Sequence, residues 1–371
     1  MKEKESSRRE ERIRITRGKI DLASIKPPGI EIKVTKRYIV LRKDKSRITI
    51  QRYVDARKFA LMLGLQRSDG AKGSNRVRFS NNNPILHRWF IEALKEMNIS
   101  KISAHCYYCN CRLHGRRKLR EVIRRFEEAT SVKVKKIYVD EQAHNPLLQV
   151  DVNNVALERF LNYAERIFRR LAVRKKMTIG LVLLYLRGVI MGDGNYNIKE
   201  DRTGNLIFHL RIYEQKNTKA RKELQLIFRK YLGIKLREMS DKSLVASINT
   251  INLLKLLKLG LIPEEYYNAV GEKLEHIMSS DHIISTLLRL YRHFGNNQFT
   301  STDAAMLLKR QRHHMLETLK ILESKGLLSS KKIKLTSANK PGTPIRRVFK
   351  ITDDGIEIIN LSSLFLSYSK C

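Results

Sequence analysis

The feature that most constrains this chain is a pattern that occurs twice, an apolar helix with small residues four apart that ends in Asp-Gly. The first copy is Ala56–Ser68 followed by Asp69-Gly70, and the second is Ile179–Gly192 followed by Asp193-Gly194. Residues at i and i+4 share one face of a helix, and small side chains there let two helix backbones approach closely. The small residues are Ala60, Gly64 and Ser68 in one copy, and Gly188 and Gly192 in the other.

The elements that follow each motif also repeat in the same order, a strand and then a helix. The segments are Arg76–Ser80 and Pro84–Met97 in one copy, and Leu206–Tyr213 and Lys219–Leu232 in the other. Further strands and helices complete each copy, namely Val132–Val139, Leu148–Val152 and Leu157–Leu171, then Leu244–Ile248 and Asn252–Leu259. A repeated order of elements indicates an internal duplication.

The two aspartates have an electrostatic problem that a cation would solve. A helix C-terminus carries partial negative charge, which disfavours a carboxylate, and packing the two helices together would add repulsion between Asp69 and Asp193. A shared divalent ion removes both penalties, and hard oxygen ligands with open water positions suit Mg²⁺ or Mn²⁺. Two such carboxylates can assemble a metal site that hydrolyses phosphodiesters. The glycine after each aspartate is expected to adopt a positive φ.

The charge of the chain indicates a polyanionic partner. Its 371 residues contain 74 Lys and Arg against 37 Asp and Glu, a formal net charge of +37. Nucleic acid phosphates are the usual counterpart of such a charge. No basic amphipathic terminal helix, lipidation signal or secretory signal is visible, and Arg187 interrupts the longest apolar run. We therefore expect no membrane partner and a cytoplasmic protein, or an organellar one in a eukaryote, that is not secreted and has four reduced cysteines.

Four regions are expected along the chain: a basic N-terminal arm with short strands (1–53), two duplicated units (54–172 and 173–277) and a C-terminal domain (278–371). Within 30–54, alternating residues predict two or three strands with a turn at Lys43-Asp44. The last region predicts three helices and then two strands around an Asn339–Gly342 turn, the order of a winged helix. The expected helices are Ile283–Phe294, Asp303–Leu308 capped by Ser301 or Thr302, and Arg310–Lys325 ending at Gly326.

Taken together, the two Asp-Gly motifs resemble those of the LAGLIDADG homing endonucleases, over roughly residues 54–270. The second motif, Leu186–Gly194, is a close match, and the 124-residue spacing of the aspartates is similar to that of single-chain members. The first, Met62–Gly70, keeps the glycine, the leucine and the Asp-Gly, but Gln66 and Arg67 replace the usual apolar and acidic residues.

The resemblance implies an α+β fold of two tandem αββαββα repeats that form a pseudo-two-fold saddle over double-stranded DNA. It implies a monomeric, Mg-dependent DNA endonuclease in which metal is held by Asp69 and Asp193, with Ser68 and Gly192 beside them. The residue that orders the attacking water would be Gln215, with Lys216 beside it, in one half, and Asn81 or Asn82 in the other. Lys72 and Lys199 are the candidates for an additional basic residue.

The strands that follow the motifs carry a polar face suited to reading DNA. By the two-residue period of a strand, His209, Arg211, Tyr213 and Gln215 share one face, and Phe208, Leu210 and Ile212 share the other. Arg76, Arg78 and Ser80 alternate with Val77 and Phe79 in the same way. Only Ala71–Asn75 separate the first motif from its strand, whereas Asn195–Asn205 can form a hairpin in the second. The resemblance implies that this hairpin reaches base edges, so the first copy is expected either to read its half-site weakly or to use the strands before Val54 instead.

Two further sites are expected outside the motifs. Gln311, Arg312 and His313 begin the expected recognition helix, where major-groove readers place their base contacts, and basic residues surround the wing. Those wing residues are Lys332, Lys334, Arg346 and Arg347. Cys106, Cys109, Cys111 and His114 have ligands suited to zinc, but they fall within ten residues, so a strand with half-buried thiols is the favoured explanation.

Two other functions remain compatible with the sequence. A LAGLIDADG-like protein with a helix-turn-helix domain can be a DNA-binding regulator that does not cleave, and other members assist the splicing of intron RNA. An intein is not expected, because residue 1 is no nucleophile and no His-Asn pair ends the chain.

Overall fold

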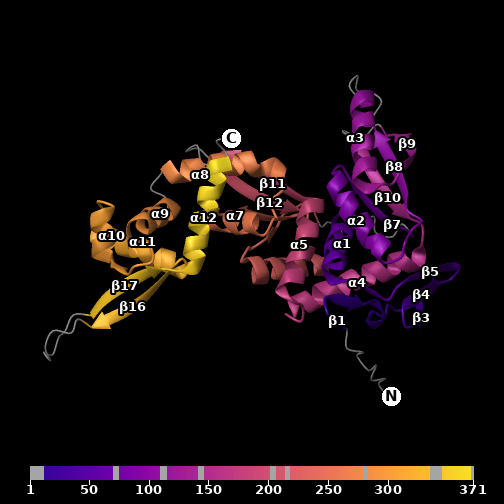
Figure 1. Cartoon of the computed structure of the whole chain (residues 1–371), viewed down its shortest axis with the longest axis horizontal. Helices are drawn as coiled ribbons and strands as arrows, with labels where there is room; N and C mark the ends of the chain where they lie inside the picture. The colour runs from indigo at the N-terminus through magenta and orange to yellow at the C-terminus, as the bar shows by residue number, and fades with distance from the viewer. Residues whose placement is uncertain are drawn as a thin grey trace, which may run out of the picture. The chain divides into compact units, whose positions relative to one another are not determined.

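The computed structural model describes residues 12–69, 75–108, 115–140, 146–200, 206–213, 218–279, 283–334 and 345–368. The architecture is α+β, as the sequence predicts. The chain divides into two compact units (Figure 1). The first unit comprises Met1–Asn197 with His209–Ala246, and the second comprises Ile198–Phe208 with Ser247–Cys371.

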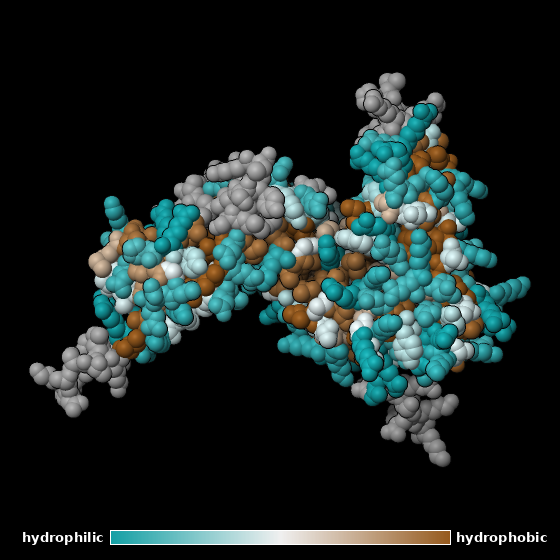
Figure 2. All heavy atoms as spheres, viewed as in Figure 1, coloured by the Kyte–Doolittle hydropathy of each residue, from teal (hydrophilic) through white to brown (hydrophobic). Residues whose placement is uncertain are grey.

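The first unit begins with two small antiparallel sheets. One has the order β1-β2-β6, from β1 (Arg14–Thr16), β2 (Lys19–Asp21) and β6 (Tyr53–Asp55). The other has the order β3-β4-β5, from β3 (Glu31–Val34), β4 (Tyr38–Lys43) and β5 (Ser46–Gln51), and Asp44 turns the chain with a φ of 51°. Within the N-terminal arm expected over 1–53, Ile20, Leu22 of a short 3-10 helix (Leu22–Ser24) and Ile25 are fully buried, so this part of the arm is folded. Hydrophilic side chains are frequent over β3–β5 in Figure 2.

The next part of the first unit packs helices against a four-stranded sheet. Its helices are α1 (Ala56–Asp69), α2 (Pro84–Glu96), α3 (Gly115–Thr130) and α4 (Val155–Val173). Its strands are β7 (Val77–Asn81), β8 (Ser103–Tyr108), β9 (Val134–Val139) and β10 (Leu147–Val152), in the order β7-β10-β8-β9. Strands β8 and β9 are parallel, which requires the crossover that α3 provides. Helix α3 was not expected from the sequence.

A second four-stranded sheet follows α5 (Ile179–Asp193), with the order β11-β12-β14-β13. Its strands are β11 (Gly194–Glu200), β12 (Leu206–Ile212), β13 (Arg237–Glu238) and β14 (Leu244–Ile248). Helix α6 (Thr218–Ile227) continues into a π turn (Phe228–Leu232) that ends at Gly233, whose φ is 70°. Within the apolar α5, Arg187 is accommodated because its guanidinium stacks on Trp89 of α2, 4.9 Å from the ring centroid.

The second unit contains α7 (Thr250–Lys258), a 3-10 turn (Glu264–Tyr266), α8 (Tyr267–Ser279), α9 (Ile283–Phe294), α10 (Ser301–Leu307), α11 (Arg312–Ser324) and α12 (Asp353–Tyr368). Strands β15 (Phe299–Thr300), β16 (Leu328–Lys334) and β17 (Ile345–Ile351) form a sheet in the order β15-β17-β16. The cap of α10 is Thr300, not Ser301 or Thr302, and its hydroxyl and Asp303 form a reciprocal capping box. Helix α12 was not expected. Among the described residues, no helix combines the length and apolarity that crossing a bilayer demands.

Candidate metal centre and nucleic-acid surfaces

Helices α1 and α5 pack side by side through their glycines (Figure 1). A Cβ on Gly64 would lie 3.0 Å from Gly188 Cα and closer still to the Tyr185 carbonyl oxygen. A Cβ on Gly188 would lie 2.7 Å from Leu65 N and closer still to the Leu61 carbonyl oxygen. Real Cβ atoms essentially never come within 3.0 Å of other heavy atoms. Both positions therefore require glycine, as the small-residue pattern predicted.

The contacts across this seam are reciprocal. Each glycine faces the carbonyl three residues before the opposite glycine, and the two glycines are 124 residues apart, the same separation as Asp69 and Asp193. Asp69 and Asp193 therefore occupy equivalent positions on the two helices, just as Gly64 and Gly188 do. The Ser68 hydroxyl donates to Leu65 O at 2.9 Å and approaches Gly188 O at 3.5 Å, so the seam continues to the last turn of α1.

Each aspartate is the last residue of its helix. Asp193 and Gly192 are half-buried, and the side chain of Asp69 lies outside the described residues. Gly194 departs from the expectation of a positive φ, because its φ is −73° and its N–H bonds to Ile190 O. Glycine is needed there for a different reason, since a Cβ would lie within 3.0 Å of Ile190 Cα and closer to Ile190 O.

The unusual Gln66 and Arg67 of the first motif face a polar stripe on α4. Gln66 is buried and its amide donates to Asn162 Oδ1 at 3.3 Å, while Arg67 is buried 3.8 Å from Glu165. Asn162 in turn donates to Glu158, four residues earlier on the same face. The departure from the apolar pattern therefore has a local structural explanation, which sequence reasoning missed because α4 is 96 residues away.

Glu165 is the centre of a buried ionic cluster. Its carboxylate accepts from Arg169 at 2.6 Å and from the Tyr185 hydroxyl of α5 at 2.7 Å, and Arg169 also donates to Glu223 at 2.6 Å. Burial opposes the charge of Arg169, but Glu165, Tyr185 and Glu223 together raise its pKa above the ordinary value. Burial and the neighbouring Glu165 raise the pKa of Tyr185 well above its usual range. This cluster links α1, α4, α5 and α6.

The polar face of the first sheet carries an interstrand network. Arg78 donates to Asp151 at 3.0 Å, and the Gln149 amide donates to Asp151 at 2.6 Å. His105 lies 3.7 Å from the same carboxylate, and Ser80 donates to Gln149 at 3.4 Å. The opposite face is the core, where Val77, Phe79, Leu148 and Val150 are buried. The predicted alternation of β7 is confirmed, and Arg76 lies half-buried just before the strand. The acidic partner of Arg78 was missed, because pairing of β7 with β10 is not visible in the sequence.

The second sheet repeats this arrangement. Phe208, Leu210 and Ile212 are buried, whereas His209 and Arg211 are half-buried and Tyr213 is exposed. Arg211 forms an ion pair with Asp241, donates to Ser243 Oγ at 3.0 Å and lies 5.0 Å from the Tyr213 ring centroid. Hydrogen bonds from Ser243, and then the charge of Arg211, lower the pKa of Asp241. In both sheets an arginine on the polar face is held by an aspartate.

Of the remaining predicted catalytic residues, some lie within the described parts of the structure and others lie outside them. Asn81 ends β7, where its side chain accepts from Asn83 N at 2.8 Å and its carbonyl oxygen lies 2.9 Å from His87 Nε2. It therefore shapes the turn into α2. Lys199 is exposed on β11. Gln215, Lys216 and Lys72 lie outside the described residues.

Of the candidate zinc ligands, Cys106 is described and the other three, Cys109, Cys111 and His114, lie outside the described residues. Cys106 is fully buried on the core face of β8, and burial raises the pKa of its thiol to about 11. A protonated thiol is a poor metal ligand. In the described parts of the chain, no group of three or more His, Cys, Asp or Glu could hold a metal ion.

Basic residues of the second unit lie at the start of α11 and on β16 and β17. Gln311, Arg312 and His313 are exposed, although His313 is 3.3 Å from Glu317 one turn later. Lys332 and Arg346 are exposed, and the side chain of Lys334 lies outside the described residues.

Arg347 is the wing residue that is held inside the unit. It donates to Glu323 of α11 at 2.7 Å and to Ser330 at 2.8 Å. The hydrogen bond from Ser330, followed by Arg347, lowers the pKa of Glu323. Arg347 therefore fixes the wing to α11.

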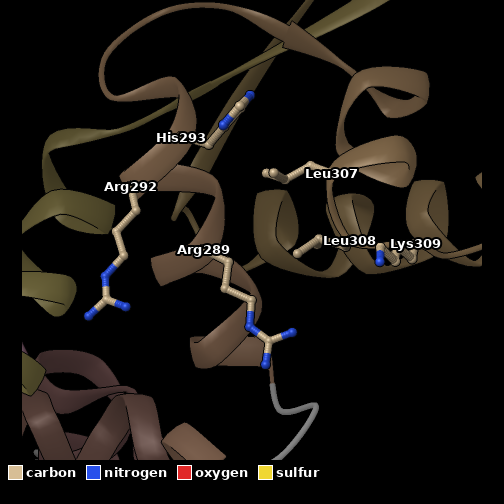
Figure 3. Close-up of a pocket in the computed structure, with 6 residues that line it drawn as sticks. All are labelled: Arg289, Arg292, His293, Leu307, Leu308 and Lys309. Carbon is tan, nitrogen blue, oxygen red and sulfur yellow. The ribbon is translucent and has the colours of Figure 1, made fainter.

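A groove of about 410 Å³ lies between α9 and the end of α10. Leu307 and Leu308 contribute its apolar wall, and the cationic side chains of Arg289, Arg292 and Lys309 surround it together with His293 (Figure 3). The guanidinium groups of Arg289 and Arg292 point away from His293 in this view. The groove therefore adds to the basic surface, but its charges do not converge on one point.

Comparisons with known proteins give limited information. No protein-family model matches this chain, and a search of curated proteins found no match. Similar solved structures include I-DmoI in complex with DNA and Mn, with a TM-score of 0.32 and 14% identity, covering 56% of this chain and 98% of that one. I-SmaMI bound to uncleaved DNA target with calcium ions has a TM-score of 0.32 and 11% identity, covering 60% and 91%. Both are LAGLIDADG homing endonucleases. At these TM-scores the likeness carries no argument about this chain, whose function must be inferred from its own residues.

Proposed function

We propose that this protein is a divalent-metal-dependent endonuclease that cuts both strands of DNA, with Asp69 and Asp193 as the metal ligands. The observation that carries the proposal is the reciprocal glycine seam between α1 and α5. It joins two helices at equivalent positions, and each helix ends in an aspartate five residues beyond its glycine. The two backbones of duplex DNA are antiparallel and equivalent. Cutting both of them therefore requires two equivalent acidic groups related as these aspartates are.

The donors at the helix ends suit Mg²⁺ or Mn²⁺. The last carbonyl groups of a helix have no N–H partner within it, so the ends of α1 and α5 offer carbonyl oxygens beside the carboxylates. Ser68 and Gly192 would contribute through these carbonyls, because the Ser68 hydroxyl already donates to Leu65 O. A bound ion would neutralise phosphate charge and lower the pKa of a water. Gln215 with Lys216, and Asn81, remain the proposed residues that orient that water.

The order of elements supports two tandem repeats, 54–172 and 173–277, of the αββαββα type. The second follows this order as α5, β11, β12, α6, β13, β14 and α7. In the first, β7, β10 and β8 occupy the places of β12, β14 and β13 in the sheet order. The polar faces of both sheets would contact the DNA, through Arg76 and Arg78 in one and His209, Arg211 and Tyr213 in the other. Phosphates would compete with Asp151 and Asp241 for the two paired arginines.

The second unit supports a winged-helix domain in 278–371. The order α9, β15, α10, α11, β16, β17, with β17 in the middle of the sheet, matches that domain. Its DNA contacts would be Gln311, Arg312 and His313 in the major groove, and Lys332, Lys334 and Arg346 on phosphate. Arg347 would position the wing through Glu323.

This domain also favours a second candidate function, a DNA-binding regulator that does not cleave. The two functions differ in metal-dependent strand scission. The decisive experiment incubates the full chain with Mg²⁺ and duplex DNA covering its own gene and the flanking sequence. We expect discrete double-strand breaks from the wild type and none from Asp193→Asn, which should still bind.

The matched control for this experiment is Asp44→Asn. Asp44 is an exposed turn carboxylate with a positive φ that asparagine tolerates, so the change should leave cutting intact. Equal binding by wild type and Asp193→Asn with no cleavage by either would favour the regulator. Preference for structured intron RNA over duplex DNA would favour a splicing factor.

A further inference from the structure

The first sheet differs from the second at both of its edges. In the second sheet β11 lies outside β12, whereas in the first no described strand lies outside β7. At the opposite edge, β13 ends the second sheet, but β8 is followed by the additional parallel strand β9. The helix α3 connects β8 to β9. Among the described residues, the first half therefore has no counterpart of β11 and has gained a strand at the opposite edge.

The added strand extends the polar face of the sheet. His105 is paired in register with Lys136, and Tyr107 with Tyr138, so these four side chains share one face. That face also carries Gln149, whose amide approaches the Tyr107 hydroxyl at 3.5 Å. It is therefore continuous with the network of Arg78 and Asp151.

The two tyrosine rings stand with their edges toward solvent. Their centroids are 5.1 Å apart with an interplanar angle of 20°, close to the spacing of about 4.8 Å between neighbouring strands. Rings stacked across strands in this way have planes roughly perpendicular to the sheet. The outer edge and hydroxyl group of Tyr138, which is 39% exposed, are then presented, whereas the Tyr107 hydroxyl lies against the Gln149 amide. Hydroxyl groups on an upright edge suit hydrogen bonding to base edges in a groove more than stacking on unpaired bases.

The surroundings of the tyrosine pair are basic. A register shift between Ala104 and His105 lets Lys135 reach the same face, where its amine lies 3.4 Å from Ser103 Oγ. Burial lowers the pKa of His105, Asp151 opposes this shift, and Lys136, Lys135 and Arg76 strengthen it. Three cationic side chains, Lys136, Lys135 and Arg76, therefore lie near His105.

We propose that β9 replaces the missing hairpin as the element that reads one DNA half-site, with Tyr138 contacting base edges and Lys136 contacting phosphate. The partner is duplex DNA. This inference rests on the proposed function, since it assumes that the polar sheet faces contact DNA. It assigns sequence discrimination to a strand that the duplicated repeat does not contain.

The test measures binding by the full chain, in Ca²⁺ without cleavage, to a duplex selected from a random-sequence pool by the wild-type protein. Tyr138→Phe keeps the ring stack and removes one hydroxyl. We expect it to reduce discrimination against base substitutions in one half-site by roughly three- to tenfold. Lys136→Ala should weaken binding to every duplex and reduce the slope of affinity against salt by about one.

Two further variants separate the possible failures. Ile137→Ser changes an exposed residue on the opposite face of β9 and should leave affinity and discrimination unchanged. Arg211→Ala tests the second sheet. If Arg211→Ala weakens binding but Tyr138→Phe and Lys136→Ala do not, the inference about β9 is wrong and the proposed function stands. If none of Arg211→Ala, Tyr138→Phe and Lys136→Ala changes DNA binding, the sheet faces do not contact DNA. Both the inference about β9 and the proposed function then fail. Tighter binding to oligo-dT than to the duplex would also overturn the inference.

Discussion

Replacing Gly64 by alanine tests the helix seam on which the proposed site depends. The new methyl would meet Gly188 Cα and Val189 N at 3.0 Å and the Tyr185 carbonyl more closely. Ordinary van der Waals contact begins at 3.4 Å, so α1 and α5 must separate or shift. The obstacles are backbone atoms of a packed helix and cannot rotate away. Overpacking of this kind costs about 1–3 kcal/mol, and more where the backbone must move.

Two opposing contributions determine whether Gly64→Ala raises or lowers the free energy of unfolding. Alanine is favoured over glycine inside a helix by about 1 kcal/mol, which offsets part of the clash. With the clash at about 3 kcal/mol, the upper end of that range because the backbone must move, we expect a net loss of about 2 kcal/mol in the free energy of unfolding of the first unit, and loss of cleavage. Urea unfolding followed by circular dichroism measures the first, and the plasmid-cutting assay measures the second.

The matched control is Gly180→Ala, on α5. A Cβ there meets nothing within 4 Å, so helix propensity alone should stabilise the protein by about 0.5–1 kcal/mol. Combining Gly64→Ala with Gly188→Ala should cost less than the sum of the single changes, because one separation of the helices relieves both clashes. A stable Gly64→Ala protein with full activity would refute the reasoning, since it would mean that the helices need no close approach.

The remaining predictions concern buried groups. Arg169→Met should destabilise the first unit by about 3–5 kcal/mol in urea unfolding, because it leaves Glu165 and Glu223 buried without their shared cation, and a loss below 1 kcal/mol would contradict the cluster. Burial lowers the pKa of His87 to about 4, below its value of about 6.5 in the unfolded chain. As the pH falls, the unfolded state therefore binds the extra proton first. The free energy of unfolding should decrease as the pH drops from about 6.5 toward about 4. His87 should account for a loss of about 2 kcal/mol at pH 5, which His87→Phe should abolish. Cys106, buried and with a raised pKa, should resist iodoacetamide at pH 8 until the protein is unfolded, and rapid labelling of the folded protein would disprove its placement.

The parts of the fold that follow local periodicity could be predicted from the sequence. The glycine spacing gave the packing of α1 on α5, and the two-residue alternation gave the buried and polar faces of β7 and β12. Gly326 ends α11 with a φ of 76°, as a C-terminal glycine should. These features depend on residues close together in the chain.

Features that depend on distant partners could not be predicted. Gln66 and Arg67 were unexplained in the sequence, because Asn162 and Glu165 reach them only after α4 is packed. The same holds for Asp151 and Asp241, which hold the arginines of the two sheets. The parallel strand β9 was expected as a strand, but its place at the sheet edge depends on the crossover through α3. The glycine after Asp193 was expected for the wrong reason, since close approach and not a positive φ requires it.

The polar stripe between α1 and α4 makes the two halves of the molecule chemically unequal. Arg67 has its acidic counterpart on α4, and the equivalent position on α5, 124 residues later, is Met191. Two copies of the first half could not simply be joined in place of the natural pair. The Tyr185 hydroxyl, which donates a hydrogen bond to Glu165, belongs to the second half and would be lost. Shuffling halves between relatives, or shortening the chain to a self-associating half, would therefore require redesign of this ionic cluster before any change to the proposed DNA-contacting surface.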